Sequence, residues 1–195
     1  MFYNKMEKNI TNVLIQENHN EIEREQISFG VKILLNDLWK FFIVYLIALQ
    51  LNCLLPTLIT HLVFYVLRQV CFGFHFENNF ICLIASVIAL PIGGYFINNL
   101  YSQNNYIIIV TAILTIILVV FAPANTAKRP VFNQEHKTYL KKKLIARLLV
   151  IWAVIFLAND VIDLFISYGI ILITISVLIQ KIKGEDKNEN QKYGA

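Results

Sequence analysis

Apolar residues fill most of the sequence from Phe41 to Ile179, and only short polar pieces interrupt them. Several of these runs approach the roughly 20 residues that an α-helix needs to cross the hydrocarbon core of a bilayer. Hydrophobic residues make up 57% of the 195 residues, and the mean hydropathy is +0.58. This composition does not fit a soluble domain, so the pattern predicts an integral membrane protein that crosses the bilayer several times.

The polar interruptions divide the sequence into an all-α, polytopic membrane helix bundle of about six transmembrane helices. The predicted spans are 36–54, 56–70, 80–97, 106–121, 144–157 and 161–179. Before them, apolar residues spaced along one helical face predict an amphipathic helix at the membrane interface: Phe2, Met6, Ile10, Val13 and Leu14. We therefore expect an N-terminal interfacial segment (1–35), an integral membrane domain (36–180) and a charged tail (181–195).

Basic residues are concentrated between Phe121 and Leu148, where Glu135 is the one acidic residue. The loop 98–105 carries no charge, and the turn near Asp160 is acidic. Loops rich in Lys and Arg stay in the cytoplasm, so the basic segment is predicted to be cytoplasmic. With six spans, both termini and the connection 68–82 then face the cytoplasm as well. The basic residues are Lys128, Arg129, Lys137, Lys141, Lys142, Lys143 and Arg147.

The cytoplasmic connection contains a thiol and an imidazole, Cys82 and His75, preceded by Arg68 and Gly73. A cysteine acts as a nucleophile when it is ionised or when a base takes its proton, and histidine is the usual base. On one continuous helix the two side chains would lie ~10 Å apart along the axis, which exceeds hydrogen-bond reach. The chain must therefore bend between them.

The residues between the two side chains permit such a bend. Gly73 loosens the backbone before His75, and Asn78 and Asn79 are favourable N-cap residues. A helix that begins there places Cys82 in its first turn, where the helix dipole favours a thiolate and backbone N–H groups could hold an oxyanion. Cys71 precedes His75 by four positions, so spacing alone leaves it open as the nucleophile. A cytoplasmic loop in which the His and the Cys have no catalytic role is an equally open interpretation of this segment.

Other chemistries have weaker support. The sequence contains no HExxH motif and no glycine-rich phosphate loop, so we expect no metal, no nucleotide and no other cofactor. The three cysteines form no CxxC pair, which makes a disulfide framework or a zinc knuckle improbable. We expect the lipid bilayer as a partner and no nucleic acid. The alternative to an enzyme is a peptide exporter or channel subunit, which would need more polar residues along its spans.

The chain resembles the accessory gene regulator protein B (AgrB) family, membrane peptidases that process quorum-sensing propeptides. The family pattern R-x4-G-x-H-x6-C corresponds here to Arg68, Gly73, His75 and Cys82. The likeness extends to the segment 122–124 (Ala-Pro-Ala) and the basic residues that follow, and it covers nearly the whole chain. Family members often have small residues on both sides of the histidine, whereas this chain has Phe74 and Phe76.

This resemblance implies a thiol endopeptidase with Cys82 as nucleophile and His75 as base, leaving Cys71 as a bystander. The substrate would be an AgrD-like propeptide, cleaved on its C-terminal side through an acyl-enzyme thioester that a cysteine of the peptide captures as a thiolactone. Family propeptides have an acidic tail, which Lys128 and Arg129 could bind. The resemblance also implies a homodimer in the bacterial cell membrane.

Overall fold

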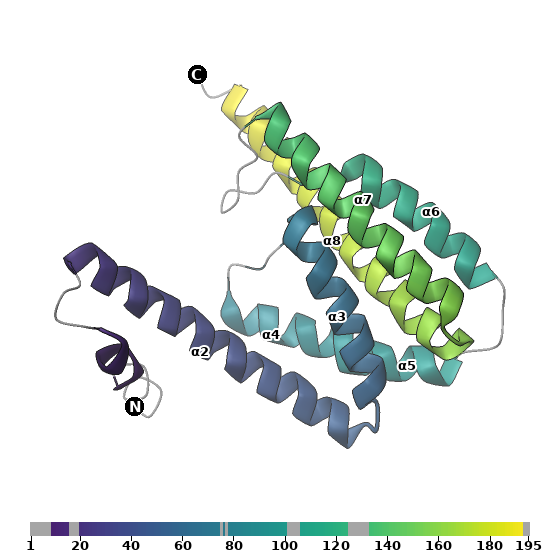
Figure 1. Cartoon of the computed structure of the whole chain (residues 1–195), viewed down its shortest axis with the longest axis horizontal. Helices are drawn as coiled ribbons and strands as arrows, with labels where there is room; N and C mark the ends of the chain where they lie inside the picture. Colours follow the sequence, from purple (N-terminus) through teal and green to yellow (C-terminus); the bar gives the residue numbers. More distant parts are fainter. Residues whose placement is uncertain are drawn as a thin grey trace. The chain divides into compact units, whose positions relative to one another are not determined.

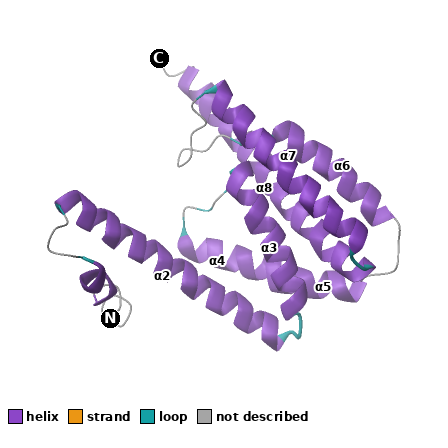
Figure 2. Ribbon diagram, in the orientation of Figure 1, coloured by secondary structure: helices purple, strands orange, loops and turns teal. Residues whose placement is uncertain are grey.

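A computed structural model describes residues 9–15, 20–74, 76, 78–100, 106–124 and 133–192. Helices joined by short connections account for nearly all of these residues, and no strand occurs among them (Figure 2). The predicted all-α class is confirmed. The helices are α2 (Glu21–Gln50), α3 (Leu54–Cys71), α4 (Asn79–Val87), the π-helical turn η1 (Ile88–Ile92), α5 (Gly93–Leu100), α6 (Tyr106–Phe121), α7 (Gln134–Leu157) and α8 (Asp160–Lys192).

Three helical stretches are long and apolar enough to cross a membrane, namely Leu54–Cys71, Asn79–Asn99 and Asp160–Lys183. A fourth apolar helix, Tyr106–Phe121, is shorter, with 16 residues. These stretches support a membrane protein and agree with the predicted spans to within a few residues. The number of six spans stays a prediction.

The N-terminal part of the chain forms a unit of its own, which extends to Leu46. Residues 9–14 are helical, and the earlier part of the predicted amphipathic helix lies outside the described residues. α2 begins at a reciprocal capping box: the Glu23 amide donates to the Asn20 side chain at 2.8 Å, and the Asn20 amide donates to the Glu23 carboxylate at 2.9 Å. Two backbone donors that the helix leaves unpaired are thereby satisfied.

In the second unit, α3 packs along α8, and the two helices run in the same direction (Figure 1). Their backbones approach closely at Gly169, where an added Cβ would lie 2.9 Å from the Val63 side chain. The Thr60 hydroxyl donates to the Phe165 carbonyl at 3.2 Å across the same interface. A small residue and an interhelical hydrogen bond are the usual means of joining helices inside a membrane, where lipid is as apolar as the side chains.

α6 and α7 complete the core around this pair (Figure 1). α7 contributes one buried stripe at helical spacing, formed by Leu140, Leu144, Leu148, Ile151 and Ile155. Its first turns carry Lys137 and Lys141–143. The sequence had suggested a loop for these basic residues, whereas the structure shows that they are helical.

The span Asn79–Asn99 is interrupted by η1, which contains Pro91. Proline lacks the N–H that an α-helix needs, so the ladder of hydrogen bonds is locally rearranged. α8 supports this turn, because the Tyr168 hydroxyl donates to the Ala89 carbonyl at 2.7 Å. The same hydroxyl explains Gly93, since an added Cβ there would lie 2.0 Å from it. Pro91 therefore coincides with a π-helical turn within this span.

Candidate active site

The segment that leads to the predicted base begins where α3 ends. Phe72 caps the helix in the left-handed conformation (φ 54°, ψ 46°), and its N–H donates to the Arg68 carbonyl at 3.2 Å. This turns the chain out of the helix axis. The Arg68 guanidinium then reaches forward and donates to the Phe74 carbonyl at 3.1 Å. Arg68 thus links the last turn of α3 to the residue that precedes His75.

The same segment is held against α8 at Ser176. The Phe74 N–H donates to the Ser176 carbonyl at 2.9 Å, and the Ser176 hydroxyl donates to the Phe74 carbonyl at 3.3 Å. Gly73 is buried, and a Cβ added to it would lie 2.4 Å from Oγ of Ser176 and 3.0 Å from its Cβ. Any larger residue would therefore force the segment away from α8, which is a structural reason for glycine at this position.

The Ala-Pro-Ala segment closes the same end of the bundle. Ala122 and Ala124 are buried, and a cis peptide bond joins Ala122 to Pro123. The Ala124 N–H donates to the Cys71 carbonyl at 2.9 Å, which satisfies one of the carbonyls left open at the end of α3. The Ala-Pro-Ala segment and the start of the Arg68–Cys82 pattern are separated by some fifty residues in the sequence. They nevertheless meet at the C-terminal end of α3.

Cys82 lies in the first turns of α4, as the sequence predicted. Asn78 is the N-cap, and its side chain accepts a hydrogen bond of 2.8 Å from the Phe80 N–H. The Cys82 N–H donates to the Asn78 carbonyl at 3.0 Å. The N–H groups of Phe80 and Cys82 are thus already engaged, which narrows the set of backbone donors that could hold an oxyanion.

The three thiols differ in their exposure. Cys71 is 0% exposed within the core formed by α3, α6, α7 and α8, and Cys53 is 1% exposed. The Cys53 thiol donates to the Pro91 carbonyl at 3.4 Å. Cys82 is partly exposed, on a helix with no fully buried residue. Of the three thiols, that of Cys82 is therefore the most accessible from outside the protein.

His75, Lys128 and Arg129 lie outside the described residues, so their predicted roles stay predictions. Other basic side chains do lie at this end of the bundle. The Lys183 ammonium lies 4.3 Å from the ring centroid of Phe74, and the Lys181 ammonium lies 4.5 Å from that of Phe121. Arg147 on α7 donates to the Val66 carbonyl of α3. Basic side chains of α7 and α8 therefore lie at this end of the bundle.

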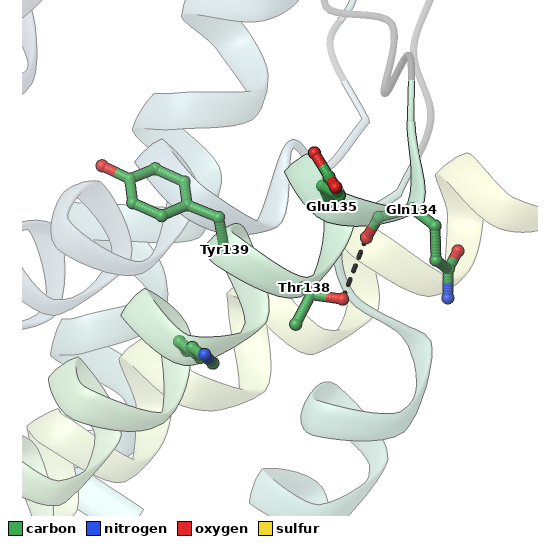
Figure 3. A pocket seen from close by; sticks show the side chains of 5 residues that line it. Gln134, Glu135, Thr138 and Tyr139 are labelled. Carbon is green, nitrogen blue, oxygen red and sulfur yellow. Dashed lines mark hydrogen bonds between the residues drawn. The ribbon is translucent and has the colours of Figure 1, made fainter.

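A surface depression of about 370 Å³ on the first turns of α7 is a separate feature (Figure 3). It is lined by Gln134, Glu135, Thr138, Tyr139 and Lys142. The Thr138 hydroxyl donates to the Gln134 carbonyl at 2.9 Å, so it is committed to its own helix. One helix alone forms this depression and no predicted catalytic residue lines it. In the ranges that the structure describes, no three His, Cys, Asp or Glu side chains are grouped to hold a metal ion.

Sequence reasoning missed Ser176. It is one of a few polar residues in the apolar run of α8, and it lies 102 positions from its partner Phe74. Spacing carries no information about a contact over such a separation. The polar side chain within an apolar span was the one available signal.

A family model and several known proteins match most of this sequence. The sequence model described as Accessory gene regulator B matches residues 7–182. Accessory gene regulator protein B of Staphylococcus aureus (strain Newman) is 31% identical over 179 residues, which cover 91% of this chain and 93% of the relative. A putative AgrB-like protein of Listeria innocua is 31% identical over 150 residues, covering 75% and 73% of the two chains. No solved structure matches the chain significantly.

Proposed function

Because the chain belongs to the accessory gene regulator B family, we propose that it is a membrane-embedded cysteine endopeptidase that cleaves an AgrD-like propeptide. The observation that carries this proposal is the placement of Cys82. It is the one partly exposed thiol of three, and it lies in the first turns of a capped helix. Cys71 and Cys53 are buried in the protein, so the thiol of Cys82 is the one that a substrate could contact without a rearrangement of the core.

In the proposed reaction, the Cys82 thiolate attacks the carbonyl of the scissile peptide bond. His75 takes the thiol proton and later delivers it to the leaving amine, which departs with the C-terminal part of the propeptide. The N-terminal part stays bound to Cys82 as a thioester. A cysteine of the peptide then attacks this thioester, which gives a thiolactone and regenerates the Cys82 thiol.

Capture by a second thiol requires that water be kept out. One thioester is exchanged for another at nearly constant free energy, whereas hydrolysis is irreversible under the same conditions. Aromatic side chains are frequent between Phe74 and Cys82. The ring centroids of Phe74 and Phe76 lie 4.9 Å apart in an edge-to-face contact, and Phe80, two residues before Cys82, is 68% exposed. We propose that these rings, at the edge of the bilayer, limit access of water to the acyl-enzyme.

The location follows from the apolar stretches. Three helices are long and apolar enough to cross a membrane, which supports a multi-pass protein of the cell membrane. The C-terminal ends of α3 and α8 lie together with the basic first turns of α7. By the positive-inside rule we propose that this end, both termini and Cys82 are cytoplasmic. The homodimer implied by the resemblance stays a prediction.

The acyl-enzyme provides a direct test. Full-length protein in detergent is mixed with an AgrD-like propeptide whose own cysteine is replaced by serine, so that capture is slowed. We expect the intact mass to increase by that of the N-terminal part of the peptide, and hydroxylamine, which cleaves thioesters, should reverse this increase. Peptide mapping should place the adduct on Cys82. Cleavage without any adduct, or an adduct on Cys71, would contradict the proposal.

The basic residues give a second prediction. Reversing two charges, Lys128→Glu with Arg129→Glu, should raise KM for an acidic-tailed propeptide and leave kcat nearly unchanged. Each basic group near a membrane surface contributes on the order of 1 kcal/mol to binding an anionic partner, and salt screens this attraction over about 10 Å. The defect should therefore shrink at high salt, and Lys128→Gln with Arg129→Gln should be intermediate. Insertion is checked in the same preparations, because charge reversal can alter topology. An unchanged KM with correct insertion would limit these residues to a topological role.

A further inference from the structure

The hydroxyl of Ser176 is used in a way that distinguishes it from a neighbouring hydroxyl on α8. Thr174 donates to the Ile170 carbonyl of its own helix at 2.7 Å, which is the common arrangement for a hydroxyl in an apolar helix. Ser176 instead donates across the helix interface to the Phe74 carbonyl at 3.3 Å. Its own carbonyl accepts the Phe74 N–H at 2.9 Å. Phe74 is therefore held by both of its backbone polar groups.

Two further contacts hold the same residue. The Arg68 guanidinium donates to the Phe74 carbonyl at 3.1 Å, so this oxygen accepts two hydrogen bonds. The Lys183 ammonium lies 4.3 Å from the centroid of the Phe74 ring. Gly73 completes the contact, because its lack of a Cβ permits the approach to Ser176. These contacts come from α3, from α8 and from the segment itself.

We propose that Ser176 is a positioning residue for the catalytic base, acting through the backbone of Phe74. This inference rests on the proposed function, in which His75 is that base. A peptide unit is planar, and the unit that carries the Phe74 carbonyl also carries the amide nitrogen of the next residue. Two donors hold the carbonyl and therefore fix the orientation of this peptide unit. Ser176 touches neither the substrate nor the reacting atoms.

The test uses the full-length protein in detergent with a wild-type propeptide. Ser176→Ala removes the hydroxyl but keeps the backbone carbonyl that accepts the Phe74 N–H. We expect kcat to fall by about tenfold while KM stays within about twofold, because the base is less well oriented but the peptide still binds. Ser176→Thr, which restores a hydroxyl, should recover most of the loss. Ser167→Ala is the matched control, since this buried serine of α8 lines a cavity beside Tyr106 and Tyr168 and not the segment 72–74.

A second readout needs no substrate. The rate at which iodoacetamide alkylates Cys82 is followed as a function of pH by peptide mass spectrometry. The profile of Ser176→Ala should shift from that of the wild type toward that of His75→Ala, whereas Ser167→Ala should keep the wild-type profile. A general loss of folding would slow turnover without this specific shift.

The outcomes separate the two proposals. If His75→Ala abolishes cleavage but Ser176→Ala matches the wild type in kcat and in the alkylation profile, the positioning role is overturned and the proposed function stands. Equal defects in Ser176→Ala and Ser167→Ala would also overturn the positioning role. If His75→Ala cleaves the propeptide normally, the assignment of the base fails, and the positioning role fails with it.

Discussion

Replacing Cys82 with serine should reduce propeptide cleavage by about a thousandfold or more, whereas replacing Cys71 should leave most of the activity. A serine hydroxyl at position 82 changes the volume little but remains protonated at neutral pH, so it cannot supply the nucleophile that a thiolate does. Cys71 is 0% exposed in the core, where a peptide carbonyl cannot reach it. Cleavage is measured by mass spectrometry of the products.

The two substitutions should also differ in stability. Cys71→Ser places a hydroxyl in an apolar core, which costs on the order of 1 kcal/mol unless the hydroxyl finds a partner. Cys71→Ala avoids this polar group and is the cleaner control. Thermal unfolding in detergent should therefore show a lower Tm for Cys71→Ser than for Cys82→Ser. An inactive but well-folded Cys71→Ala beside an active Cys82→Ser would show that the nucleophile is Cys71.

A single added methyl at Gly73 should also slow catalysis strongly, although less than the loss of the Cys82 thiol. The new Cβ would lie 2.4 Å from Oγ of Ser176 and 3.2 Å from its backbone carbonyl carbon, so the segment 72–74 has to move away from α8. A displacement near 1 Å at a catalytic group can cost about a hundredfold in rate. We therefore expect Gly73→Ala to lose about a hundredfold in kcat, measured with the same propeptide.

Gly94 provides a matched control for this substitution. Gly94 lies in α5, and a Cβ added to it meets its nearest neighbour, Cβ of Pro56, at 3.8 Å, which is ordinary contact. Gly94→Ala should keep near wild-type kcat. Combining Gly73→Ala with Ser176→Gly removes the atoms closest to the added Cβ, so the double variant should cleave faster than Gly73→Ala alone. The effects of substitutions at two residues in contact are not additive. A fully active Gly73→Ala would show that the contact with Ser176 has no part in catalysis.

The sequence by itself determined the features that depend on residues close to one another along the chain. Apolar runs of membrane length predicted the stretches Leu54–Cys71, Asn79–Asn99 and Tyr106–Phe121 within a few residues, because burial in lipid requires such runs whatever packs beside them. The pair Asn78 and Asn79 predicted the start of α4, because a capping side chain acts within three residues of itself, and the structure shows that Asn78 is the N-cap. The position of Cys82 in the first turns of that helix followed directly.

Tertiary structure alone decided which thiol is exposed and why Gly73 is a glycine. Cys71 and Cys82 are both within a few residues of His75, and spacing left both open as nucleophiles. Packing of α6, α7 and α8 around the end of α3 buried Cys71 and left Cys82 partly exposed. Gly73 meets Ser176, and Ala124 meets Cys71, across long separations in the sequence. Burial and backbone contact depend on which surfaces the helices bring together, and local spacing along the chain does not specify those surfaces.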